Sequence, residues 1–80
     1  MDIRKVFGAN VRVYRLAAGL SQEAVAVRMG VDRAYVSAIE RGRQNATLLT
    51  IREVAQALGV RPADLIVEPA RNRSLDRKGS

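Results

Sequence analysis

Arginine is the residue type in this chain that carries the most specific binding chemistry. The 80 residues include 12 Arg and 2 Lys against 8 Asp plus Glu, which gives a formal net charge of +6. A guanidinium donates hydrogen bonds through a rigid fork that fits phosphate oxygens and the O6 and N7 atoms of guanine. A positive balance alone favours polyanions in general. The arginine content therefore indicates a partner that carries phosphates.

The residue types most often used for catalysis and metal binding are missing. The sequence has no His and no Cys, which removes the commonest general base, thiolate metal ligands and disulfides. Ser21 and Ser37 could act as nucleophiles only with a base in reach, and no His can serve. We therefore predict no enzymatic activity, no cofactor, no metal and no small-molecule ligand.

Membrane insertion is also not expected from the sequence. No apolar run approaches the roughly 20 residues that span a bilayer. The N-terminal residues MDIRKVF lack the apolar segment of a signal peptide. These two observations predict a cytoplasmic protein with no membrane partner.

Two short helices, predicted between residues 21 and 42, would position the arginines and serines of interest. Ser21 can cap a helix over 22–29, and Asp32 can cap a second helix over 33–41. A glycine follows each helix, where the chain needs a left-handed conformation. Two short helices joined by a three-residue break at 30–32 are typical of a motif that lays its second helix in a DNA groove.

The flanking chain must complete a core, because two such short helices are not stable alone. We expect a longer helix over 3–18, a helix over 48–58 capped by Thr47, and a short fifth helix opened by Pro62. The expected buried positions are Phe7, Val11, Tyr14, Ala18, Leu20, Val25, Ala26, Met29, Val36, Ile39, Leu48, Ile51, Val54, Ala55 and Leu58. Nothing alternates with period two, so the sequence predicts one compact all-α domain of five helices over 1–67.

The last residues, 68–80, differ in composition from the rest. They contain one Leu and are rich in Arg, Ser, Asp and Gly, with a Pro near the join. We expect a flexible basic C-terminal tail. Loose phosphate contacts and a merely solvated end both remain open for it.

Residues 7–67 resemble the lambda-repressor-like, or xenobiotic-response-element (XRE), helix-turn-helix proteins. The resemblance rests on Gly-Leu-Ser-Gln at 19–22, Ile-Glu-Arg-Gly at 39–42 and Ala-Leu-Gly-Val at 57–60, all at the family's spacing. The segment VDRAYVSAIERGRQN looks most like the controller proteins of restriction-modification systems, although general bacterial regulators share it. The resemblance implies a sequence-specific, double-stranded DNA-binding transcriptional regulator, either a repressor or an activator, acting as a homodimer on a two-fold operator.

The resemblance also implies a role for each matching position. The helix 33–41 would be the recognition helix in the major groove, with Arg33 as the main base reader. Ala34, Ser37 and Ala38 would share its outward face. A phosphate contact alone is the alternative for Arg33.

Other matching positions resemble the family's contacts to the DNA backbone and its internal supports. The backbone positions are Gln22, Tyr35, Arg41, Arg43, Gln44 and Asn45. Gln22 could instead be a plain first-turn residue, and Tyr35 could be partly buried. Arg15 and Glu40 match an ion pair that ties the first helix to the recognition helix.

A single recognition helix covers too few bases to find a genomic site, so we expect a homodimer. The apolar residues Leu65, Ile66 and Val67 are the predicted interface, with core closure as the alternative for Leu65. Two small alanines on the recognition helix offer little direct readout, which suggests that DNA shape carries part of the specificity. A second possible function is a protein-interaction module, such as an antitoxin.

Overall fold

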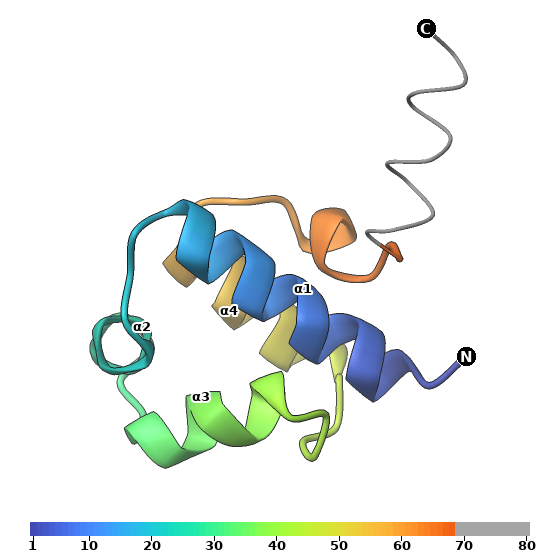
Figure 1. The fold of residues 1–80 in the computed structure, drawn as a ribbon, viewed down its shortest axis with the longest axis horizontal. Coiled ribbons are helices and arrows are strands. Elements are labelled where there is room, and N and C mark those ends of the chain that lie inside the picture. The colour runs from blue at the N-terminus through green and yellow to red at the C-terminus, as the bar shows by residue number, and fades with distance from the viewer. Residues whose placement is uncertain (69–80) are drawn as a thin grey trace, which may run out of the picture.

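The computed structural model of this chain describes residues 1–68 (Figure 1). Its elements are α1 (Ile3–Ala17), α2 (Gln22–Met29), α3 (Arg33–Glu40), α4 (Leu48–Leu58) and the 3-10 helix η1 (Pro62–Leu65). No strand occurs within this range. The all-α prediction is confirmed. None of the helices in the described part of the chain is long and apolar enough to cross a membrane.

The predicted fifth helix is corrected to a four-residue 3-10 turn, η1. Its short span between Pro62 and the buried Leu65 leaves room for one turn, which the Asp64 amide closes by donating to the Arg61 carbonyl at 3.0 Å. The tail predicted over 68–80 lies outside the described residues, apart from Glu68.

Local capping signals account for most helix ends. The Ser21 hydroxyl accepts from the Ala24 amide at 3.0 Å, and the Thr47 hydroxyl accepts from the Thr50 amide at 3.1 Å. Asp32 occupies the N-cap of α3, but its side chain makes no capping hydrogen bond, so the predicted cap is wrong in this respect. The backbone there has the extended conformation of a cap, while the carboxylate does not turn back onto the first-turn amides.

The core forms where the helices converge. Its fully or nearly fully buried members are Phe7, Val11, Val25, Ala26, Val36, Ile39, Ile51, Val54, Ala55, Ala57, Leu58 and Leu65. Two expected core positions are wrong: Ala18 is exposed, and Leu48 is 88% exposed. Ala18 follows the last residue of α1, and Leu48 opens α4, whose first two residues project beyond the core.

Helix α3 lies along one edge of the molecule and packs on both α1 and α2, with α4 behind α1 in this view (Figure 1). Gly8 permits the contact between α1 and α3, because a Cβ there would lie 2.2 Å from the Ile39 carbonyl oxygen. The backbones of the two helices therefore meet directly, and α3 keeps one face outward.

Candidate nucleic-acid interface

The outward face of α3 combines one long cation with small side chains. Arg33 and Ala34 are exposed, and Ser37 and Ala38 are half-buried. Val36 on the opposite side of the helix is 1% exposed and belongs to the core. Because these small side chains project little from the helix, a partner's atoms can approach the α3 backbone closely.

Arg41 extends this face by one turn. It follows the last residue of α3, and its Nη1 atom donates to Ser37 Oγ at 2.7 Å. Residues four apart on a helix lie on the same side, so Arg33, Ser37 and Arg41 form one stripe. The stripe presents polar groups at its two ends and its middle.

A buried ion pair holds α3 to α1 from behind. Arg15 Nε lies 2.6 Å from Glu40 Oε2, and Arg15 Nη2 lies 3.0 Å from Glu40 Oε1. Both side chains are buried, with 8% and 4% exposed. The hydrogen bonds that Arg15 donates to Glu40 raise the pKa of Arg15 above its ordinary value, against the opposing effect of burial. A two-pronged pair in this position restricts the rotation of α3 relative to α1.

Glu40 also bonds α2, which the sequence did not indicate. The Gln22 amide nitrogen donates to Glu40 Oε1 at 3.1 Å, and Arg12 Nη1 lies 3.9 Å from the same oxygen. Gln22, expected to contact the DNA backbone, is thus held at the α2–α3 junction. Arg12 is 61% exposed and points to the same region. Its position one helical turn before Arg15 is the signal that could have singled it out.

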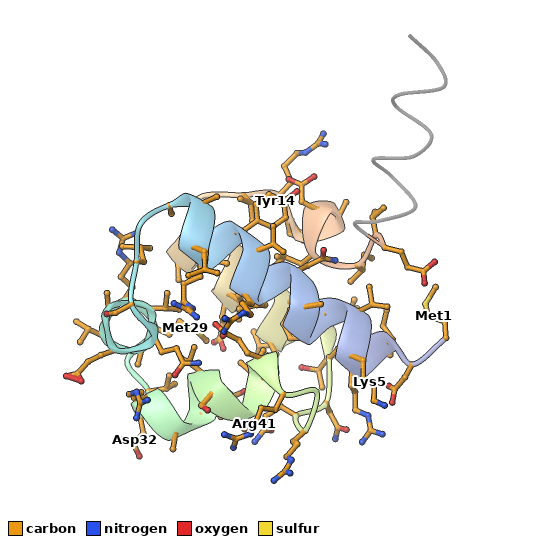
Figure 2. The ribbon with its side chains drawn as sticks, in the orientation of Figure 1. Met1, Lys5, Tyr14, Met29, Asp32 and Arg41 are labelled. Carbon is orange, nitrogen blue, oxygen red and sulfur yellow. The ribbon has the colours of Figure 1, made fainter. Side chains whose placement is uncertain are left out.

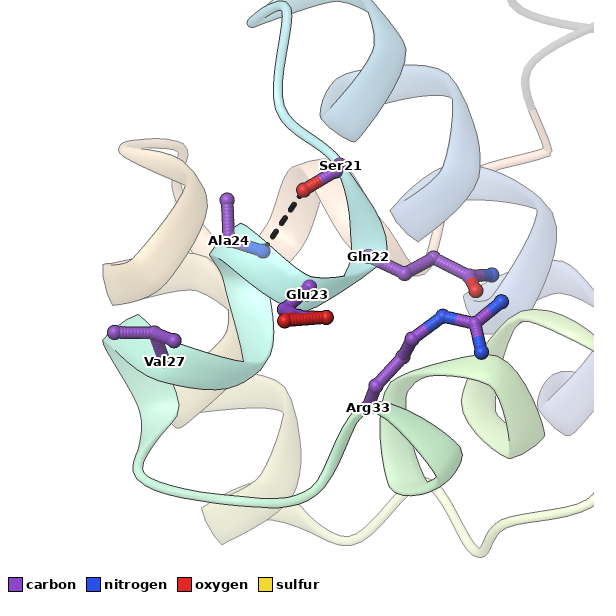
Figure 3. Close-up of a pocket in the computed structure, with 6 residues that line it drawn as sticks. All are labelled: Ser21, Gln22, Glu23, Ala24, Val27 and Arg33. Carbon is purple, nitrogen blue, oxygen red and sulfur yellow. Dashed lines mark hydrogen bonds between the residues drawn. The ribbon is translucent and has the colours of Figure 1, made fainter.

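An open hollow of about 640 Å³ lies between α2 and the start of α3 (Figure 3). It is lined by Ser21, Gln22, Glu23, Ala24, Val27 and Arg33. The Gln22 amide and the Arg33 guanidinium lie beside each other at one side of it, and Val27 lies at the other (Figure 3). The two predicted DNA-contacting residues therefore project to one surface.

The loop after α3 adds exposed polar groups to the same edge. Arg43 and Asn45 are exposed, and Gln44 is half-buried. Lys5, a cation to which sequence analysis gave no specific role, lies beside this loop: a Cβ on Gly42 would be 3.0 Å from Lys5 Cγ. Figure 2 shows Lys5 and Arg41 along the same lower edge of the molecule.

Tyr35 is only partly accessible at this surface. It is half-buried, and its side chain packs against the core. This placement agrees with the alternative that sequence analysis left open for it.

The three residues predicted for a dimer interface separate in the structure. Leu65 is 0% exposed and belongs to the core, so its assignment to the interface is corrected: its side chain closes the bundle and is not available to a partner. Ile66 and Val67 are 42% and 39% exposed. The Asn10 amide nitrogen donates to the Val67 carbonyl at 2.7 Å and fixes this segment against α1.

Comparison with known proteins agrees with this arrangement. Residues 11–65 match the helix-turn-helix family. An uncharacterized HTH-type transcriptional regulator of Sinorhizobium fredii is 47% identical over 66 residues, which cover 82% of this chain and 86% of that protein. The control protein C.BamHI of Bacillus amyloliquefaciens is 44% identical over 66 residues, covering 81% and 82%.

A solved structure is similar as well. It is the restriction-modification controller protein C.Esp1396I, a tetramer in complex with its natural 35 base-pair operator. It has a TM-score of 0.73 at 26% identity, covering 81% of this chain and 86% of that chain. The helix pair, the outward α3 face and these matches all point to one family of transcription regulators, which is not a family of enzymes. Its members similar to this chain include restriction-modification controller proteins. We conclude that the chain belongs to the lambda-repressor-like helix-turn-helix family of DNA-binding transcription regulators.

Proposed function

We propose that this protein is a cytoplasmic homodimer that binds a two-fold operator in double-stranded DNA and thereby regulates transcription. The observation that carries the proposal is the outward face of α3, which begins with Arg33 and otherwise has small side chains. The buried Arg15–Glu40 pair fixes this helix to α1. A helix of this kind fits the major groove, which is about 12 Å wide.

Contacts to the bases would come from the stripe on α3. The Arg33 guanidinium can bond O6 and N7 of one guanine, and Ser37 can bond either a base or a phosphate. Ala34 and Ala38 permit close approach or contact with a thymine methyl group. Contacts to the DNA backbone would come from α2, from α3 and from the residues that follow α3: Gln22, Tyr35, Arg41, Arg43, Gln44 and Asn45. Backbone contacts of this kind set the register of the helix on the duplex.

The dimer would form through exposed apolar residues at the start of α4 and near the end of the described chain. Ile66, Val67 and Leu49 are all substantially exposed, with Leu49 at 61%. Pairing through them would place two recognition helices on half-sites about 34 Å apart, one helical turn of DNA. The operator complex of the C.Esp1396I tetramer supports an assembly of more than one chain on the DNA.

Selection of bound fragments from a random double-stranded DNA library tests the proposal. We expect an inverted repeat whose half-sites lie about one helical turn apart. Recovery of no common sequence would refute the operator proposal and favour the protein-interaction module.

Sedimentation of the protein alone tests the dimer separately. The Ile66→Glu variant should sediment as a monomer and bind one half-site weakly, because it buries a charge in the proposed interface. The matched control for sedimentation alone is Val27→Glu on α2, which is 74% exposed and lies outside that interface. A wild-type protein that sediments as a monomer, both free and on DNA, would contradict the dimer.

A further inference from the structure

The hydrogen-bonding groups that α3 offers outward are almost all donors. The Arg33 and Arg41 guanidinium groups can only donate. Glu40 is the only carboxylate among residues 33–41, but its side chain is 4% exposed and both of its oxygens accept hydrogen bonds from α1 or α2. Tyr35 has its ring packed against the core. Ser37 is then the group that decides whether this face can also accept a hydrogen bond.

In the structure, Ser37 Oγ already accepts one hydrogen bond, which comes from Arg41. Arg41 Nη1 donates to Ser37 Oγ at 2.7 Å, a short bond from a charged donor. Ser37 Oγ makes no other side-chain hydrogen bond within residues 1–68, so its own hydrogen is left to donate. The adjacent positive charge further disfavours the approach of a second donor to that oxygen.

We infer that α3 reads only hydrogen-bond acceptors on the bases, and that Arg41 is the positioning residue that makes Ser37 a donor. The inference rests on the proposed function, since it specifies what the same helix recognises. In the major groove the acceptors are N7 and O6 of guanine, O4 of thymine and N7 of adenine, whereas cytosine N4 and adenine N6 are donors. Ala34 and Ala38 leave room for the thymine methyl. The base facing Ser37 therefore presents an acceptor, which guanine, thymine and adenine N7 supply and cytosine does not.

The test uses the duplex recovered from the random library together with all its single base-pair variants. Ser37→Ala should reduce the discrimination against cytosine at one base pair by about 2- to 10-fold, the range expected for one neutral hydrogen bond. Arg41→Met should reduce the preference at the same base pair, because the serine oxygen can then accept. Arg41→Lys keeps a charged donor in reach and should restore it.

A matched control separates positioning from simple loss of charge. Arg43→Met removes an exposed cation from the same edge but has no bond to Ser37, so it should weaken all sequences alike and leave every base preference unchanged. In the Ser37→Ala background, Arg41→Met should cause no further change in preference at that base pair, although it can still lower overall affinity.

Different failures separate this inference from the operator proposal. A wild-type protein with no base preference at all would refute both. A wild type that selects an operator, with Ser37→Ala leaving every preference unchanged, would refute the inference alone. The inference alone is also refuted if the base pair affected has cytosine facing Ser37, or if Arg41→Met alters the preference equally with and without the serine hydroxyl.

Discussion

Replacing Gly8 with alanine tests the central contact of the structure, because local preference and tertiary packing predict opposite signs. Gly8 lies within α1, and alanine is favoured over glycine in a helix by about 1 kcal/mol. Helix propensity alone therefore predicts that the Gly8→Ala protein is more stable than the wild type.

The packing of α1 on α3 predicts the reverse. The added Cβ would lie 2.2 Å from the Ile39 carbonyl oxygen and 3.0 Å from that of Glu40, whereas ordinary contacts begin near 3.4 Å. The two backbones would have to separate by more than 1 Å, and no flexible side-chain end is present to give way. Overpacking of this kind costs about 3 kcal/mol at the upper end of its usual range. After subtraction of the propensity gain of about 1 kcal/mol, we expect a net loss of about 2 kcal/mol.

Urea and thermal unfolding followed by circular dichroism measure this loss. A decrease of about 2 kcal/mol corresponds to a Tm lower by about 8 to 16 °C in a domain of this size. The neighbouring, exposed Ala9→Gly variant is the control: it should lose about 1 kcal/mol through propensity alone. If Gly8→Ala were as stable as the wild type or more stable, the close contact between α1 and α3 would be wrong.

Three further predictions concern charge. Glu40→Gln leaves the buried Arg15 guanidinium without a counter-charge, so the free energy of unfolding measured in urea should fall by about 3 kcal/mol. A loss within error of zero would show that the Arg15–Glu40 pair does not hold α3. In DNA-binding assays Arg33→Ala should relax the preference at one base pair by about 1 to 3 kcal/mol. Arg43→Ala should weaken binding to all sequences and make the slope of log affinity against log salt concentration shallower by about one unit. Equal loss on all sequences for both variants would leave Arg33 as a phosphate contact. The Arg4 backbone amide donates a hydrogen bond to the Asp2 carboxylate and lowers its pKa. The stability that Asp2 contributes is therefore present above its unfolded-state pKa and is lost as the pH falls through the lower, folded-state pKa. The difference in the free energy of unfolding between wild type and Asp2→Ala should shrink in that acid range, and a difference independent of pH would contradict this.

Several features of the fold could be read from single residues. The start of α2 after Ser21 and the start of α4 after Thr47 were predicted, because a hydroxyl caps amides only two or three residues away. Gly30 and Gly59 end the same two helices with a φ of 72°, a conformation that favours glycine. These signals act within one turn of the chain, so no knowledge of distant residues was needed.

The candidate site was only partly predictable. Resemblance to the family brought Arg15 and Glu40 together in advance, and the structure places them in contact. It could not show that Gln22 shares the same carboxylate, or that Lys5 lies beside the loop after α3. Both contacts join residues distant in the sequence, and each depends on the angle at which α1, α2 and α3 meet.

The sequence by itself therefore determined the four α-helices, the caps at Ser21 and Thr47 and the outward order of Arg33, Ser37 and Arg41, since these follow from interactions within a few residues. Only the tertiary structure decided which apolar residues are enclosed. Leu65 enters the core while Ile66 and Val67 remain exposed, although all three are similarly apolar. The physical reason is that burial depends on which neighbouring helix lies over each side chain, and that neighbour comes from distant parts of the chain.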